Sequence, residues 1–197
     1  MRILLLVGWL LAPIAVGIWH YGPGQERMKL DAAAEALAQA DRCVAAEQWT
    51  EAVEHYDEAL KLLPADKAAE QRRIRLEKCK AQMLCRKLPE AHAELKTLVE
   101  ELQGDAGTAP NMLAEARSAL AQAQYYMTWL MRLEGQPREQ WEPEIEAARQ
   151  TYRLLEEQAE SRGDASAIQK NREDLESAVR LARMDLSELQ GLPLPSQ

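Results

Sequence analysis

The sequence predicts an all-α fold, both from its composition and from the spacing of its apolar residues. Hydrophobic residues make up 47% of the chain, yet aromatic residues make up only 5% and phenylalanine is absent. The apolar content therefore comes mainly from alanine and leucine, which favour helices, as do the abundant glutamate, glutamine, lysine and arginine. The chain lacks the alternation of β-branched and polar residues that is typical of half-buried strands.

The first element is an apolar segment, in which residues 3–19 carry no charge. A helix of this length spans about 26 Å, close to the roughly 30 Å thickness of a hydrocarbon core. Trp19 and Tyr21 would lie at the membrane interface, where amphipathic aromatic side chains are favoured. A Gly-Pro-Gly break follows. We therefore expect residues 1–25 to form a transmembrane anchor or signal segment, with residues 3–21 in the membrane.

The charge beside this segment predicts its orientation. Arg2 and the terminal amine favour an N-in arrangement, because the opposite flank mixes acidic and basic residues. The protein would then cross an inner or plasma membrane once, with its soluble part extracytoplasmic, or periplasmic in a bacterium. Cleavage after Ala15-Val16-Gly17 is the alternative and would produce a secreted protein. It would leave apolar Ile18 and Trp19 at the new N-terminus, so an uncleaved anchor is favoured.

A helix with one face of small residues is predicted from Trp49 to Leu63. Ala52, Tyr56 and Ala59 share this face at spacings of four and three residues. Two small side chains let a second helix approach closely, and the tyrosine fills the space between them. Pro64 then ends the helix.

This stretch resembles the second helix of a tetratricopeptide repeat (TPR), because the two alanines, the tyrosine and the proline just named occupy the signature positions of that family. The resemblance implies a first helix at residues 33–46, with Ala40 at the small position of the family. Cys43 stands where the family usually has an aromatic residue and Ala36 where it has tryptophan, so the first helix matches only in part.

A weaker copy of the pattern follows 39 residues later, where Ala91, Leu95 and Leu98 take the three positions of the face. Cys79 takes the small position of the corresponding first helix. The period of the family is 34 residues, so five extra residues are expected in a longer connection, around Asp66 to Arg72.

A third, degenerate unit is predicted from residues 112–133 and 145–159, on either side of a Gly-Gln-Pro loop. Ala148, Tyr152 and Leu155 repeat the spacing of the first two copies. The resemblance thus covers residues 33–160 and implies a short helical-hairpin solenoid of two to three repeats.

The last helix is expected to cap this solenoid, because repeat stacks need a capping element at their ends. Asp164 is its predicted N-cap and Gly191 marks its end. Its apolar stripe consists of Ile168, Leu175, Val179, Ala182, Leu186 and Leu189. Pairing with another chain is the alternative use of this stripe. Residues 26–190 are therefore expected to form one TPR-like domain, and residues 191–197 a disordered tail.

No motif of catalysis or metal binding is present in the sequence. His20, His55 and His92 lie in separate segments without zinc-ligand spacing, and the chain has no HExxH, P-loop or GxSxG motif. His55 and His92 are expected on helix surfaces. Free thiols, buried on helices, are expected at the three cysteines, which follow no CxxC spacing: Cys43, Cys79 and Cys85. We expect neither an enzyme nor a bound cofactor.

The net charge of −8 argues against nucleic-acid binding, which needs a broad cationic surface. The stretch from Asp66 to Lys87 departs from this acidic background, with eight basic and three acidic residues. In a TPR the first helices line a concave groove, so the resemblance implies groove positions at Arg73, Leu76, Lys80, Met83 and Leu84. Such a groove would bind an acidic protein or peptide. Neutralisation of neighbouring acidic helices is the alternative role of these cations.

A second dense cluster, from Tyr125 to Met131, includes Tyr126 and Trp129. It could form a peptide-binding platform, but filling of the core between alanine-rich helices is the favoured interpretation. The sequence therefore predicts a membrane-tethered, TPR-like scaffold or adaptor that binds a protein or peptide partner. The alternative is a structural or oligomerisation subunit of a larger membrane-associated complex.

Overall fold

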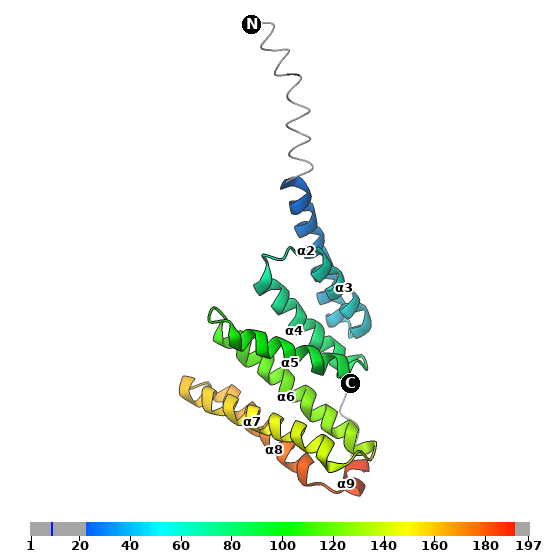
Figure 1. Ribbon diagram of the computed structural model, residues 1–197, viewed down its shortest axis with the longest axis vertical. Helices are drawn as coiled ribbons and strands as arrows, with labels where there is room; N and C mark the ends of the chain where they lie inside the picture. The colour runs from blue at the N-terminus through cyan, green and yellow to red at the C-terminus, as the bar shows by residue number, and fades with distance from the viewer. Residues whose placement is uncertain (1–8, 10–22, 192–197) are drawn as a thin grey trace. The chain divides into compact units, whose positions relative to one another are not determined.

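The computed structural model describes Trp9 and residues 23–191 of the chain. Within this part every regular element is an α-helix (Figure 1), which confirms the predicted all-α class. Among the helices of this part, none is both long and apolar enough to cross a membrane. The apolar helix expected over residues 3–21 lies outside the described residues, apart from Trp9.

The described helices follow one another with short connections. They are α2 (Pro23–Ala45), α3 (Trp49–Leu62), α4 (Ala68–Leu84), α5 (Leu88–Gly104), α6 (Pro110–Leu133), α7 (Arg138–Arg162), α8 (Ala165–Arg183) and α9 (Leu186–Gln190). The helices predicted around the three copies of the pattern correspond to α2–α3, α4–α5 and α6–α7.

The chain divides into two compact units, the first ending at Gln71 and the second beginning at Arg72. The first unit contains the hairpin of α2 and α3 and the first turn of α4. The second contains the rest of α4 and the helices from α5 to α9. The single domain expected for residues 26–190 remains a prediction.

In the first unit, α2 and α3 pack against each other through small side chains. Ala33, Ala36 and Ala40 of α2 are each 5% exposed or less. The buried residues of α3 are Ala52, Val53, Tyr56 and Ala59. Alanines let the two backbones approach closely, and the tyrosine ring fills the volume beside them, as dense packing requires.

The second unit has two apolar clusters that both use α6. The first joins α4, α5 and α6 through residues that include Leu76, Cys79, Leu95, Leu98, Ala116 and Ala119. The second joins α6, α7, α8 and α9 through residues that include Ala121, Trp129, Ile145, Tyr152, Leu181 and Leu189. Because α6 contributes to both clusters, the core continues from one hairpin to the next. Figure 1 shows α5, α6, α7 and α8 side by side in this order.

The second helix of each hairpin buries the same three positions. None of these nine side chains is more than 4% exposed: Ala52, Tyr56 and Ala59 in α3, Ala91, Leu95 and Leu98 in α5, and Ala148, Tyr152 and Leu155 in α7. The small position of the first helix is fully buried at Ala40 in α2 and at Cys79 in α4. The sequence pattern therefore corresponds to a repeated packing arrangement.

Four helices end in the same turn. In each of these turns one residue has a positive φ. The angle is 57° at Glu47, 64° at Arg86, 73° at Gly135 and 70° at Gly163. The N–H of the next residue donates to the carbonyl oxygen five residues before it, at N···O distances between 2.8 and 3.1 Å. This hydrogen bond defines the Schellman motif, which satisfies carbonyl groups at a helix C-terminus. The same turn between helices thus recurs along the chain together with the three buried positions of the second helix.

The predicted long connection around Asp66 to Arg72 is shorter than expected, because α4 begins at Ala68. Alanine and glutamate occupy the first turn of α4, and both favour helix. The residues expected in this connection are therefore divided between the loop at residues 63–67 and the first turns of α4.

The last helix also ends earlier than predicted, at Arg183. Asp164 is its N-cap as expected and accepts a hydrogen bond from the N–H of Ala167 at 3.0 Å. The break follows from a capping box, in which Asp185 accepts from the N–H of Glu188 at 2.8 Å and Glu188 accepts from the N–H of Asp185 at 3.1 Å. This motif starts the separate helix α9. Leu186, a residue of the predicted apolar stripe, is consequently 45% exposed.

Arg132, in the last turn of α6, holds the end of α8. Its guanidinium donates hydrogen bonds to the carbonyl oxygens of Leu181 and Met184. Carbonyl groups at this end of a helix have no partner within the helix, so a side-chain donor stabilises them. The same guanidinium lies 4.8 Å from the ring centroid of Trp141 on α7. One side chain thus connects three helices.

We expect Gly163→Ala to lower the free energy of unfolding by about 1 kcal/mol, because a Cβ disfavours the left-handed conformation. A Cβ at this position would meet no atom within 4 Å, so the measurement would report backbone strain and not a clash. Gly104→Ala is the matched control, since it also has open space but no positive φ. The control should unfold at the same or a higher urea concentration. Unchanged stability of Gly163→Ala would contradict this account of the turn.

Candidate functional site

The five residues predicted to line a groove all lie on α4, but the structure does not bring them to one surface. Leu76 has no exposed surface and Met83 is 7% exposed, and both belong to the apolar cluster of α4, α5 and α6. Their expected place in an open groove does not hold in this structure. Arg73 is exposed, and Lys80 and Leu84 are half-buried. Partner binding through these three side chains stays a prediction.

Within the basic stretch, Arg75 pairs with two carboxylates of α5. Its Nε lies 2.5 Å from an oxygen of Glu94 and its Nη1 lies 2.6 Å from an oxygen of Glu101. The hydrogen bond with Glu101 raises the pKa of Arg75 above its ordinary value, and the same contact lowers the pKa of Glu101. These side chains are partly exposed, so each pair contributes modestly to stability.

Two further cations of the stretch are paired in the same way. Arg72 Nη1 lies 2.5 Å from Asp105, the residue after α5. Lys80 Nζ lies 3.0 Å from Glu77 of α4 and 2.5 Å from Glu115 of α6. Burial opposes the charged form of Lys80, but the hydrogen bonds with Glu115 and Glu77 outweigh it and raise its pKa. Much of the basic charge on α4 is therefore neutralised by acidic side chains within the unit.

Arg73 and Arg86 differ from these paired cations. Both side chains are exposed, and neither forms an ion pair within residues 23–191. A partner could contact both of these exposed basic side chains without breaking an ion pair within residues 23–191.

The aromatic cluster of α6 mainly fills the core, as the favoured interpretation predicted. Trp129 is 6% exposed and belongs to the cluster of α6, α7, α8 and α9. The ring of Tyr125 meets the ring of Tyr126 edge-on at 5.6 Å between centroids, and it lies 6.2 Å from the ring of Trp129. The two tyrosines remain half-buried and provide the accessible part of the cluster.

Asp174 on α8 lies within electrostatic range of Tyr125 and Tyr152, and it was not identified from the sequence. Burial raises the pKa of its carboxyl group. Burial is also the main cause of the raised pKa of Tyr125 and of Tyr152, and the negative charge of Asp174 adds to it. A half-buried carboxylate beside aromatic rings is chemically suited to a cationic group. Its sequence signal is an acidic residue next to Leu175, on the apolar side of the predicted cap helix.

His92 and Glu144 form a pair between α5 and α7. The His92 Nε2 and Glu144 Oε2 atoms are 3.0 Å apart, and the two side chains are 16% and 25% exposed. The expected surface position of His92 is therefore wrong. The hydrogen bond with His92 is the main cause of a lowered pKa of Glu144, and a contact with Gln124 and the charge of Lys96 add to it. The partners are 52 residues apart, so no local spacing reveals the pair.

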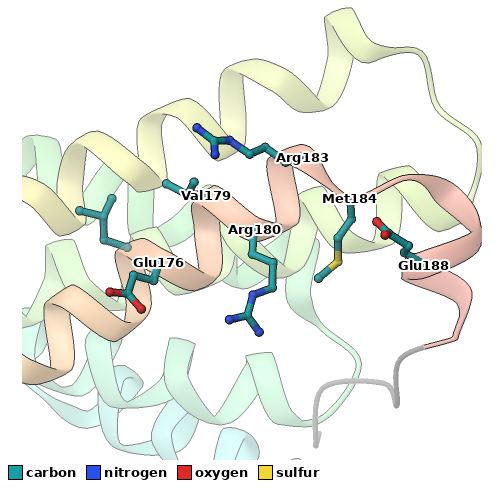
Figure 2. Close-up of a pocket in the computed structure, with 7 residues that line it drawn as sticks. Glu176, Val179, Arg180, Arg183, Met184 and Glu188 are labelled. Atoms are coloured by element: carbon teal, nitrogen blue, oxygen red, sulfur yellow. The ribbon is translucent and has the colours of Figure 1, made fainter.

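Two shallow hollows lie on the second unit. One has a volume of about 340 Å³ and is lined by residues of α5, α6 and α7 that include Val99, Arg117, Leu120, Gln124, Thr151 and Leu154. The other has a volume of about 540 Å³ and lies on the outer side of α8 and α9 (Figure 2). Among the described residues, no group of histidine, cysteine, aspartate or glutamate side chains is arranged to hold a metal ion.

We expect Glu144→Gln to make the free energy of unfolding depend less steeply on pH at acidic pH. The pKa of Glu144 is lower in the folded state than its unfolded value of about 4.3, so its ionised form adds stability above that pH. This contribution is lost as the pH falls through the folded-state pKa. Between about pH 5 and pH 3 the variant should lose less stability than the wild type. His92→Gln, which removes the partner, should weaken this pH dependence too, and identical slopes for all three proteins would contradict the assignment.

No protein-family model matches the chain, and comparison with curated proteins finds no match for it.

Proposed function

We propose that the chain is a TPR-like helical-hairpin scaffold that binds a protein or peptide partner and is tethered to a membrane by its N-terminal segment. The observation that carries this proposal is the threefold recurrence of the buried small-and-large face in α3, α5 and α7. The Schellman turn after α2, α4 and α6 recurs with it. Catalysis has no part in the proposal.

The recurrence supports a binding role for a physical reason. In the second unit, neighbouring hairpins pack their apolar faces against each other, so this stack is stabilised internally and its outer helix faces stay available. Repeat stacks of this kind present extended surfaces to other proteins. An acidic partner would be attracted by Arg73 and Arg86, whose charges are not neutralised by an ion pair within residues 23–191. Lys80 would contribute less, because Glu77 and Glu115 already pair with it.

Arg73→Ala should reduce partner capture by about ten-fold if this side chain is a central contact. The full chain would be purified from its native membrane in mild detergent, and the co-purifying protein quantified for each variant. Arg153→Ala is the matched control, since Arg153 is 75% exposed and its ion pair within residues 23–191 is with Glu157 on its own helix. Recovery of the wild-type chain without a stable partner, or equal capture by both variants, would contradict the proposal.

The membrane tether makes a separate prediction. If residues 3–21 form an uncleaved anchor, the full chain should stay in the membrane pellet after alkaline extraction, and its N-terminal sequence should begin at residue 1. Cleavage at the small-residue site would instead produce a chain that begins at Ile18 and is released from the membrane. That result would contradict the tether while leaving the scaffold untouched.

The second candidate function is that of a structural or oligomerisation subunit. The hollow beside α8 and α9 favours it, because a partly uncovered flank of a helical repeat can pack against another chain.

A further inference from the structure

The hollow on the outer side of α8 and α9 combines apolar and charged side chains. Its lining consists of Leu175, Glu176, Val179, Arg180, Arg183, Met184 and Glu188. Figure 2 shows these side chains arranged along α8 and the start of α9. Leu175, Val179 and Met184 are half-buried, so part of their apolar surface remains in contact with solvent. The hollow is therefore an incompletely covered helix flank.

The order of the helices explains why this flank is uncovered. In the second unit α4 packs with α5 and α6 packs with α7, and in each case the covering helix has 17 residues or more. Within residues 23–191, α8 is followed by α9, which has five residues. Within the described part of the chain, no helix of similar length covers the flank of α8. A further helix in this position would bury the exposed part of the apolar residues.

We propose that α8 of a second copy of this chain occupies the hollow, so that two α8 helices pack antiparallel about a two-fold axis. A two-fold interface is isologous, which means that one patch must be complementary to itself when its direction is reversed. The charges along α8 meet this requirement. Glu176 lies just past the middle of α8, and Arg180 and Arg183 lie about one and two turns after it, in the C-terminal half of the helix.

Reversing the helix about a point between Val179 and Arg180 places Glu176 of each copy opposite Arg183 of the other. The contact is made twice because of the symmetry, and Arg180 lies beside it. Val179 then lies close to the axis, and its apolar side chain faces the apolar residues of the second copy. Glu176 and Arg183 do not pair within one chain, and neither Arg180 nor Arg183 forms an ion pair within residues 23–191. These charges are therefore free to pair between copies.

Other occupants match the hollow less well. An acidic segment would be attracted by the two arginines but repelled by Glu176 and Glu188, and a basic segment would meet the opposite conflict. A segment with the same charges in reverse order satisfies both signs, and the chain itself carries that segment. The net charge of −8 opposes association in general, so association of two copies requires local complementarity of this kind.

The pairing can be tested by exchanging charges in the full-length chain. Two copies with different affinity tags would be co-expressed, extracted in mild detergent, and one captured through its tag. Wild type should capture wild type. Capture should fall at least about ten-fold for Glu176→Arg with itself and for Arg183→Glu with itself, because like charges then face each other twice. Capture should return when Glu176→Arg is paired with Arg183→Glu, because both contacts are then between opposite charges.

Glu157→Arg is the control for a change of charge on an exposed helix surface, since Glu157 is 61% exposed on α7. It should leave capture unchanged, and circular dichroism of every variant would show that the helices are retained. Absence of self-capture by wild type would overturn the proposal. Equal capture by all pairs would place any association on another surface, and failure of the mixed pair to recover would overturn the antiparallel register. Each outcome is independent of Arg73 and of the partner expected there.

Discussion

The close approach of two helices at a fully buried alanine is the constraint on which the rest of the structure depends. Ala52, Ala91 and Ala148 have no exposed surface, and each belongs to the second helix of a hairpin. A larger side chain there would force the helices apart, at a typical destabilisation of about 1–3 kcal/mol for an overpacked core. The larger apolar residues of the same face pack around this contact. The turn between the two helices brings them together at it.

The fold could be predicted from the sequence wherever the structural signal is local and periodic. The helices of all three hairpins and the N-cap at Asp164 follow from spacing and from short-range capping chemistry. The capping box of Asp185 and Glu188 also has a local sequence signal. The apolar stripe continues through Leu186, however, and so predicted one uninterrupted helix. The candidate surfaces were harder to predict, because the contacts of Arg132 and of His92 join segments that are far apart in the chain. No helical period connects such residues.

The basic residues of α4 form ion pairs between helices as well as an exposed charged surface. Arg72 and Arg75 pair with carboxylates on α5 or just after it, and Lys80 pairs with a carboxylate on α6. These cations therefore link helices whose acidic side chains would otherwise repel each other. Counting charges along the sequence could not separate these side chains from the exposed Arg73. Whether a basic side chain of α4 is paired or exposed depends on which helix its turn of α4 faces. That is known only from the three-dimensional structure.

The three free cysteines make the two units distinguishable by chemistry. Burial raises the pKa of Cys79 to about 12, and its side chain has no exposed surface, so the reactive thiolate forms only when the core of α4, α5 and α6 opens. Cys43 is half-buried in the first unit, and Cys85 is half-buried in the turn after α4. Rates of alkylation at these native thiols would therefore report separately on the first unit, on the core of the second and on one of its turns. The protein carries its own site-resolved probes of local opening, without an added label.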